Sequence, residues 1–334
     1  MADSRRGPGF TLYGGGNRVI GGFDQPVAVA DPGWDHLAPQ SGRAYSVGVV
    51  DNGVVLDAEG RAHEWFGENH LSFCRDDDED VISGEAGFLD NGAGHGTFIA
   101  GLVLHEAPTA RIRMWGAVNN ERPRGDDKPG LDTLDDFAVA AAIRALAINP
   151  DVVVINLSFG GGVFGEDKPP AELTAALDQV DFDRVAVVAA AGNENSDRKV
   201  WPAGFERVLS VGAFDGTRMA PGATPPRAEF SNYGDWVKAY ASGVQVLGPF
   251  VNFEEVGNLA FPPRPAQPFI GWAQWSGTSF AAATVSGRIA QMAIKNPRMT
   301  GADAARALLE EAPKISEQDA RLQFPNSAGR AIIL

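Results

Sequence analysis

Cysteine is almost absent from this chain of 334 residues, since Cys74 is the only one. A single cysteine cannot form an internal disulfide, which favours a reducing compartment and predicts a cytoplasmic protein. Cys74 stands just before the acidic run at residues 76–80. Because negative neighbours disfavour the thiolate, we expect Cys74 to be an inert thiol and not a catalytic nucleophile.

Long apolar runs and a surplus of basic residues are also missing. No stretch approaches the roughly 18–20 apolar residues that a membrane span requires. No apolar run follows the arginines near the N-terminus, so no secretory signal is expected. The formal net charge of −15 repels phosphate backbones, so nucleic acid is not an expected partner. These absences predict a soluble, cytoplasmic protein with no membrane contact.

Apolar segments alternate with helical patterns from residue 44 onward. The patterns predict strands at 44–50, 111–115, 152–157, 185–190 and 208–213. They predict helices at 95–107, 134–148, 170–180, 279–295 and 302–311. Continuous apolar strands that alternate with helices indicate a parallel sheet covered on both faces. We therefore expect an α/β fold of three layers, in which helices sandwich a mainly parallel β-sheet.

The domain organisation is expected to be simple. Residues 1–40 are rich in glycine, proline and polar side chains, and predict an N-terminal arm that lies on the main body. No internal repeat or linker divides residues 41–334, which are expected to form one domain. The proline-rich segment at 246–275 is expected to be a long loop.

Three segments place a reactive side chain among small residues at an element boundary. Asp51 ends the first predicted strand, His95 begins the first predicted helix, and Ser279 begins the last long one. A serine hydroxyl is a poor nucleophile at neutral pH, and it needs a neutral histidine to take its proton. A carboxylate on the far nitrogen then holds the histidine in one tautomer and stabilises its charged form. The pattern predicts a Ser–His–Asp triad.

These segments resemble the three signature motifs of the subtilisin family of serine proteases, itself a standard example of this triad, in the order Asp, His, Ser. Together with further matches, the resemblance runs from about residue 44 to about 290. It implies the three-layer α/β/α fold and a serine endopeptidase that acts on peptide or protein substrates. It implies no required cofactor, and the oligomeric state stays open.

Two further segments resemble regions of the family that act around the reacting bond. Residues 189–195 match the segment that stabilises the oxyanion, which implies that the side-chain amide of Asn193 and the backbone N–H of Ser279 are its donors. Gly192 is assigned to substrate binding, because glycine lets a substrate backbone approach closely. Loss of such a side-chain donor costs on the order of 100- to 1000-fold in turnover.

The resemblance also implies a substrate-binding edge. Residues 156–161 resemble the strand edge that pairs with an extended substrate, which assigns Ser158, Phe159 and Gly160 to substrate binding. Phe159 is expected to line a pocket for an upstream substrate side chain. Val200 matches a position near the floor of the main specificity pocket, where we expect it to narrow the pocket and disfavour large aromatic side chains.

The chain departs from the family pattern at several positions. Asn52 follows the aspartate where Ser or Thr is usual, and Ala283 and Ser242 replace usual prolines. None of these changes removes a catalytic group, although Ala283 leaves the pose of Ser279 less defined. The 50 residues before Asp51 are too few for a signal peptide and a full prodomain, so control by the arm, by a partner or by a narrow substrate range is expected.

Alternatives remain for metal binding and for the reaction. Calcium in the acidic run at 76–80 is not supported by the spaced ligand pattern of calcium loops, and carboxylate runs usually face water. Structural calcium is left open by the resemblance, because many members of the family carry calcium sites, but no ligand motif assigns a metal site in this sequence. The same triad also fits a transpeptidase or macrocyclase that passes the acyl group to an amine. A third possibility is a non-catalytic peptide-binding protein, against which the complete set of catalytic groups argues.

Overall fold

The computed structural model describes residues 23–24, 26–41, 45–57, 59–74, 92–117, 136–160, 168–253 and 268–334, and the backbone of two short strands at 18–19 and 133–134. The central feature is a sheet of eight strands in the order β13-β10-β9-β8-β7-β3-β5-β4. Every pair of neighbours in this sheet is parallel. The strands are β3 (Ser46–Asp51), β4 (Leu71–Phe73), β5 (Arg111–Gly116), β7 (Val152–Leu157), β8 (Ala186–Ala190), β9 (Leu209–Phe214), β10 (Ala239–Ser242) and β13 (Ala331–Ile333).

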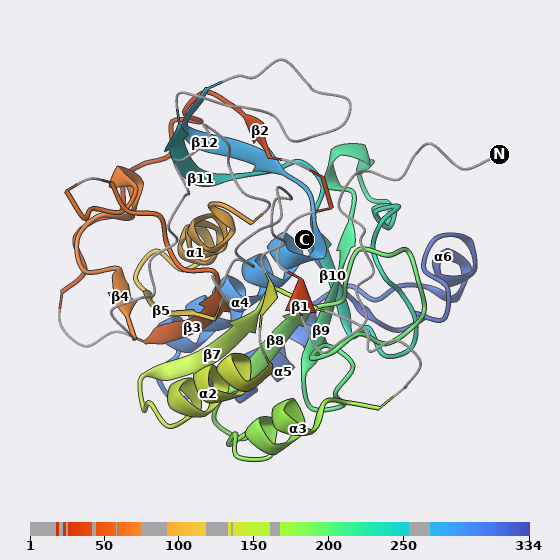
Figure 1. Ribbon diagram of the computed structural model, residues 1–334. Coiled ribbons are helices and arrows are strands. Elements are labelled where there is room, and N and C mark those ends of the chain that lie inside the picture. Colours follow the sequence, from red (N-terminus) through yellow and green to blue (C-terminus); the bar gives the residue numbers. More distant parts are fainter. Residues whose placement is uncertain are drawn as a thin grey trace, which may run out of the picture.

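Helices cover both faces of this sheet (Figure 1). One apolar core includes residues of α1 (His95–Glu106), α4 (Thr278–Lys295) and α5 (Gly301–Glu311). The other core includes residues of α2 (Asp136–Ala147), α3 (Ala171–Leu177) and α6 (Glu317–Leu322). Because side chains alternate along a strand, Val49 enters the first core and Val50 the second. The predicted three-layer α/β/α fold is confirmed.

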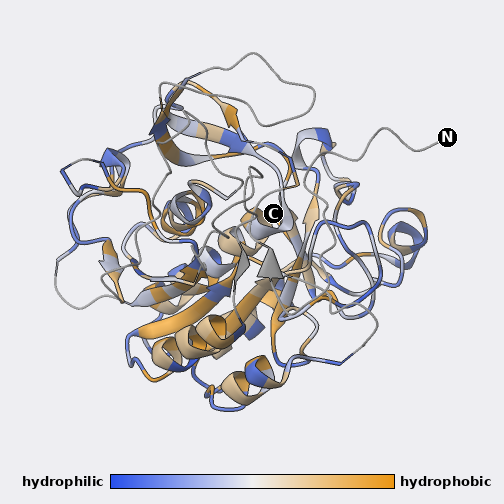
Figure 2. Cartoon of the chain, in the orientation of Figure 1, coloured by the Kyte–Doolittle hydropathy of each residue, from blue (hydrophilic) through white to orange (hydrophobic). Residues whose placement is uncertain are grey.

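The central strands are mostly apolar because neither face meets water. All residues of β3, β7, β8 and β9 are buried. Figure 2 shows hydrophobic residues on these strands and on α2, whereas the surrounding loops are mostly hydrophilic. This is the continuous apolar pattern of a sheet covered on both sides.

The prediction of a loop at 246–275 is wrong for the residues that the structure describes there. These form β11 (Val246–Phe253) and β12 (Phe269–Trp275), an antiparallel pair, and β2 (Val27–Ala28) adds a third strand to β12. The register shifts between Pro249 and Asn252. A register shift accommodates a proline, which cannot donate a hydrogen bond to a ladder. Most of the prolines that suggested a loop lie in residues 254–267, outside the described part.

The other predicted elements agree with the structure to within a few residues, except where short strands intervene. The second helix begins at Asp136 rather than 134, because β6 (Thr133–Leu134) pairs antiparallel with β1 (Arg18–Val19). The sequence did not predict β4, β10, β13 or α6, which are all six residues or shorter. Two short 3-10 helices, Glu64–Phe66 and Gly216–Arg218, complete the described elements.

The described part of residues 1–40 is attached to the body at several points. Besides the pairing of β2 with β12, Trp34 packs against Trp65 and Trp272, with ring centroids 5.4 and 5.3 Å away. The backbone N–H of Leu37 donates to the carbonyl oxygen of Trp65 at 3.1 Å. A domain boundary at residue 40 stays a prediction.

Candidate active site

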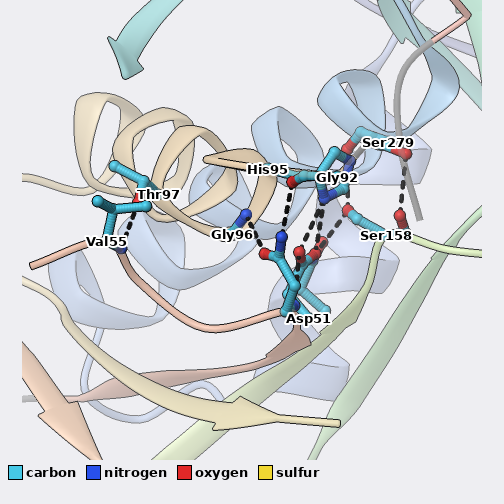
Figure 3. Close-up of polar contacts among 10 residues, drawn as sticks. Asp51, Val55, Gly92, His95, Gly96, Thr97, Ser158 and Ser279 are labelled. Carbon is cyan, nitrogen blue, oxygen red and sulfur yellow. Dashed lines mark hydrogen bonds and ion pairs between the residues drawn. The ribbon is translucent and has the colours of Figure 1, made fainter. Parts of the chain in front are cut away.

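The structure brings the predicted aspartate and histidine into direct contact (Figure 3). Asp51 is the last residue of β3 and His95 is the first residue of α1. The Nδ1 atom of His95 lies 2.8 Å from one carboxylate oxygen of Asp51 and 3.0 Å from the other. Both side chains are fully buried. A carboxylate in this position fixes the imidazole orientation and stabilises its protonated form.

Asn52 joins the end of β3 to the start of α1. Its Oδ1 atom accepts a hydrogen bond from the backbone N–H of Gly96 at 2.8 Å, and its Nδ2 atom donates to the carbonyl oxygen of Gly92 at 2.6 Å. A Cβ atom at Gly96 would lie 2.0 Å from the carbonyl oxygen of Gly53, so only glycine fits there. Asn52, which departs from the family pattern, therefore places an amide between the elements that carry Asp51 and His95. Its oxygen accepts one hydrogen bond there and its nitrogen donates another.

Aromatic side chains enclose the imidazole of His95. The ring of Trp275 stands edge-on to it, with centroids 5.6 Å apart and an interplanar angle of 87°. The Phe280 ring lies 5.7 Å away, and Trp275 and Phe280 are 5.2 Å apart. The Nε2 atom of His95 is buried, and no described residue makes a hydrogen bond to it. It is the ring nitrogen that is placed to accept a proton.

Ser279 is the second residue of α4, and its side chain is buried next to the end of β7. Its hydroxyl donates to the carbonyl oxygen of Ser158 at 2.9 Å (Figure 3). The hydroxyl therefore points at β7 and not at His95 in this structure. A change of rotamer about the Cα–Cβ bond redirects the oxygen, and catalytic hydrogen bonds commonly tighten only when substrate is bound.

A buried chain of hydrogen bonds ties α4, which carries Ser279, to β7. The hydroxyl of Ser158 donates to the carbonyl oxygen of Ser279 at 2.9 Å and accepts from Asn156 Nδ2 at 2.8 Å. The hydroxyl of Ser286, two turns along α4, donates to Asn156 Oδ1 at 2.9 Å. The role of Ser286 was not predicted, because a lone serine inside an apolar helix does not indicate which residue it will bond. Ala283 lies between these contacts in an unbroken helix.

Asn193, the predicted oxyanion donor, is held by Thr278, the residue before Ser279. The Oδ1 atom of Asn193 accepts hydrogen bonds from the backbone N–H and from the hydroxyl of Thr278, both at 2.9 Å. The same hydroxyl accepts from the backbone N–H of Gly192 at 3.1 Å. With its oxygen held in this way, the amide of Asn193 presents its Nδ2 end as a donor beside the start of α4.

Asn232 fixes the loop that carries Asn193. It accepts hydrogen bonds from the backbone N–H groups of Glu194 and Ser196, at 3.1 and 3.0 Å, and donates to the carbonyl oxygen of Ala191. Although Glu194 is exposed as a residue, its carboxylate turns inward and accepts from Asn232 Nδ2 at 2.6 Å. Burial raises the pKa of Glu194, and the hydrogen bonds offset this only in part.

The residues assigned to substrate binding follow the carboxyl ends of β7 and β8. A Cβ atom at Gly160 would lie 3.3 Å from Val200 Cγ2, so these two residues are neighbours. Gly192 has a φ of +95°, and a Cβ there would lie 2.6 Å or less from Glu194 and Asn232. Phe159 is 2% exposed and belongs to the core under α2 and α3, so its role in a pocket stays a prediction.

The described residues hold no group of three or more histidine, cysteine or acidic side chains that could bind a metal. The acidic run at 76–80 lies outside the described residues, so the expectation for calcium is untested there. Within the same limits, no helix has the length and apolar character to cross a membrane.

Comparison with known protein families matches residues 42–329 to the subtilase family. The chain belongs to the subtilase family. A thermophilic serine proteinase of Bacillus sp. strain AK1 is 30% identical over 292 residues, which cover 86% of this chain and 60% of that protein. The subtilisin-like protease het-Q2 of Podospora anserina is 33% identical over a region that covers 58% of this subtilase and 46% of het-Q2. This subtilase thus spans about half to three fifths of these relatives.

The fold also matches solved structures. The patellamide maturation protease PatA superposes with a TM-score of 0.59 at 24% identity, covering 90% of this chain and 94% of that one. The prenylagaramide maturation protease PagA gives the same TM-score at 23% identity, with coverages of 87% and 90%. At this level of identity the likeness establishes the subtilisin-like fold.

Proposed function

We propose that this subtilase is a serine endopeptidase that hydrolyses peptide bonds through an acyl-enzyme on Ser279. The observation that carries the proposal is the buried pair of Asp51 and His95, which lies beside the helix start that bears Ser279 and next to the anchored amide of Asn193. A nucleophile, a base, an orienting acid and an oxyanion donor then surround one point.

The reaction begins when the hydroxyl of Ser279 turns toward His95. Nε2 of His95 removes the hydroxyl proton as the oxygen attacks the substrate carbonyl carbon, and Asp51 stabilises the imidazolium through Nδ1. The tetrahedral oxyanion accepts hydrogen bonds from Asn193 Nδ2 and from the backbone N–H of Ser279. His95 then gives its proton to the leaving amine as the C–N bond breaks.

A water molecule completes the cycle. His95 removes a proton from the water molecule while the water oxygen attacks the carbonyl carbon of the ester. His95 then returns that proton to the Ser279 oxygen as the ester bond breaks and the acyl group leaves as a carboxylic acid. Each step uses side chains of this chain and water. The start of α4 adds the positive end of a helix dipole beside the oxyanion.

The proposed substrate is an extended peptide or protein segment. Backbone pairing along the end of β7, at Ser158 and Gly160, reads main chain rather than sequence, so side-chain preference depends on pockets. Val200, next to Gly160, supports a narrow main pocket that disfavours large aromatic side chains. For location we propose the cytoplasm, which the single cysteine supports.

A fluorophosphonate probe tests the catalytic proposal directly. We expect the probe to label Ser279 in the wild type, and we expect Ser279→Ala to abolish labelling while the protein stays folded. An unlabelled but folded wild type would contradict the enzyme assignment and leave a peptide-binding protein. A library of peptides with mass readout then distinguishes hydrolysis from ligation, because a ligated or cyclised product is one water lighter than the hydrolysed peptide.

A further inference from the structure

Asp24, in the N-terminal arm, holds the residue that leads into the nucleophile helix. One carboxylate oxygen accepts from the backbone N–H of Ser276 and the other from its hydroxyl, both at 3.0 Å. The backbone N–H of the preceding residue, Phe23, donates to the carbonyl oxygen of Ser276 at 2.6 Å. The ring of Phe23 also stacks on Phe230 at 4.5 Å. Three polar groups of Ser276 are thus bound to the arm.

The same arm residue contacts the aromatic enclosure of the catalytic histidine. Nε1 of Trp275 donates to the carbonyl oxygen of Asp24 at 2.6 Å. Trp275 is the last residue of β12, 2% exposed, and its ring packs edge-on against His95 and beside Phe280. The orientation of this indole is therefore fixed at one end by the arm and at the other by the active site.

Only two residues separate Ser276 from Ser279. Gly277 is extended, with φ 166° and ψ 155°, and its backbone N–H donates to the carbonyl oxygen of Gly243 at 2.8 Å. Gly277 has no side chain to cap the start of α4, and Asn193 Oδ1 accepts from the backbone N–H of Thr278 at 2.9 Å. The direction in which the Ser279 N–H and hydroxyl point therefore depends on how residues 276–278 are held, by Asp24 at Ser276, by Gly243 at Gly277 and by Asn193 at Thr278.

We infer that Asp24 is a positioning residue of the active site, an inference that rests on the proposed peptidase activity. Its carboxylate fixes the entry of α4, and its carbonyl oxygen fixes the indole that packs on His95. It touches neither substrate nor the reacting atoms. The described part of the arm is thus part of the support for catalysis, although it is distant in sequence from all three triad residues.

The test compares Asp24→Ala and Asp24→Asn with wild type in the full chain. Asp24→Ala removes both acceptors for Ser276, and we expect the fluorophosphonate labelling rate and kcat to fall by about 10- to 100-fold with KM little changed, since small misplacements of reacting groups have effects of this size. Asp24→Asn keeps one acceptor oxygen for the Ser276 N–H, so we expect a smaller loss. A kcat for Asp24→Asn that lies between those of Asp24→Ala and wild type would follow from the hydrogen bonds at Ser276.

Two controls separate positioning from general stability. Asp31→Asn alters another arm carboxylate, which accepts from the nearby Gly33 N–H at 2.7 Å, and should leave kcat unchanged. Tyr240→Phe removes a buried hydrogen bond to Ser327, in the core on the face of the sheet opposite α4, and should lower Tm while kcat, measured well below Tm, stays at the wild-type value.

The possible outcomes are distinct. If wild type is labelled and Asp24→Ala keeps its labelling rate and kcat, the positioning role is overturned while the peptidase assignment stands. If Tyr240→Phe lowers kcat as much as Asp24→Ala at an equal loss of Tm, the effect is one of stability and the role is also overturned. If folded wild type is not labelled, the peptidase assignment fails and the role fails with it.

Discussion

Asn52 Oδ1 accepts a hydrogen bond from the backbone N–H of Gly96 at 2.8 Å, and so ties the residue after Asp51 to the residue after His95. The N–H of Gly96 belongs to the first turn of α1, where backbone donors have no partner inside the helix. A single side chain thus satisfies the helix start and sets the spacing between the elements that carry Asp51 and His95.

Asn52→Ala should therefore weaken both stability and catalysis. Loss of a capping interaction costs about 0.5–2 kcal/mol, and displacement of His95 lowers kcat. Urea unfolding and peptide hydrolysis measure the two effects. Asn52→Ser introduces a residue usual in the family, but its single short hydroxyl cannot bond both Gly92 and Gly96. Wild-type stability in Asn52→Ser would contradict the bridging role.

Asn193→Ala should lower kcat by about 100- to 1000-fold with little change in KM, because the amide stabilises charge that develops only in the transition state. Steady-state hydrolysis of a peptide substrate measures both constants. Ser196→Ala, three residues along the same loop, is the matched control and should leave kcat near the wild-type value. Equal effects of the two changes would argue against an oxyanion role.

Ser286→Ala should destabilise the fold by about 1–3 kcal/mol, because Asn156 Oδ1 then loses its buried donor. Thr284→Ala on the same helix is the control, since the Thr284 hydroxyl bonds only the carbonyl oxygen of Phe280 within its own helix, at 3.1 Å. Urea unfolding of both variants measures the difference. Equal free energies of unfolding would show that the buried chain contributes nothing.

Glu194→Gln should stabilise the protein increasingly as pH rises above the usual glutamate pKa of 4.5. Burial raises the pKa of Glu194 above its usual value of 4.5, so the neutral carboxyl favours folding. This contribution is present below the unfolded pKa and is lost as pH rises through the folded pKa. Gln stays neutral and keeps an acceptor for Asn232, so the difference from wild type grows with pH.

Free energies of unfolding in urea at pH 5 and pH 8 measure this effect. The Glu68→Gln variant, which removes one exposed carboxylate, is the control for the change in net charge. A constant offset for Glu194→Gln across the range would show that the carboxylate is solvated in the folded state.

The sequence predicted those parts of the molecule whose signals are local. Buried strands such as β8 are continuous apolar runs. The segments of Asp51, His95 and Ser279 each place a reactive side chain among small residues. The short edge strand β13 lacked such a signal, because three residues show no period. The β11–β12 pair was missed because segment 246–275 is rich in proline, whereas a register shift accommodates Pro249 within the pair.

Contacts that join distant segments could not be read from the sequence. The bonds from Asp24 to Ser276 and from Ser286 to Asn156 depend on which elements become neighbours in the folded chain. No local pattern at Asp24 or Ser286 indicates these partners. The direction of the Ser279 hydroxyl, toward Ser158, is likewise a property of packing and not of the motif that surrounds it.

The helix that carries Ser279 has a consequence for how the protein inactivates. Twelve of the 18 residues of α4 are buried, and they pack against the central strands. Fraying at this helix start would therefore open the core as well. Loss of peptidase activity on heating should then coincide with the cooperative melting of the whole domain, without an earlier inactive yet folded stage.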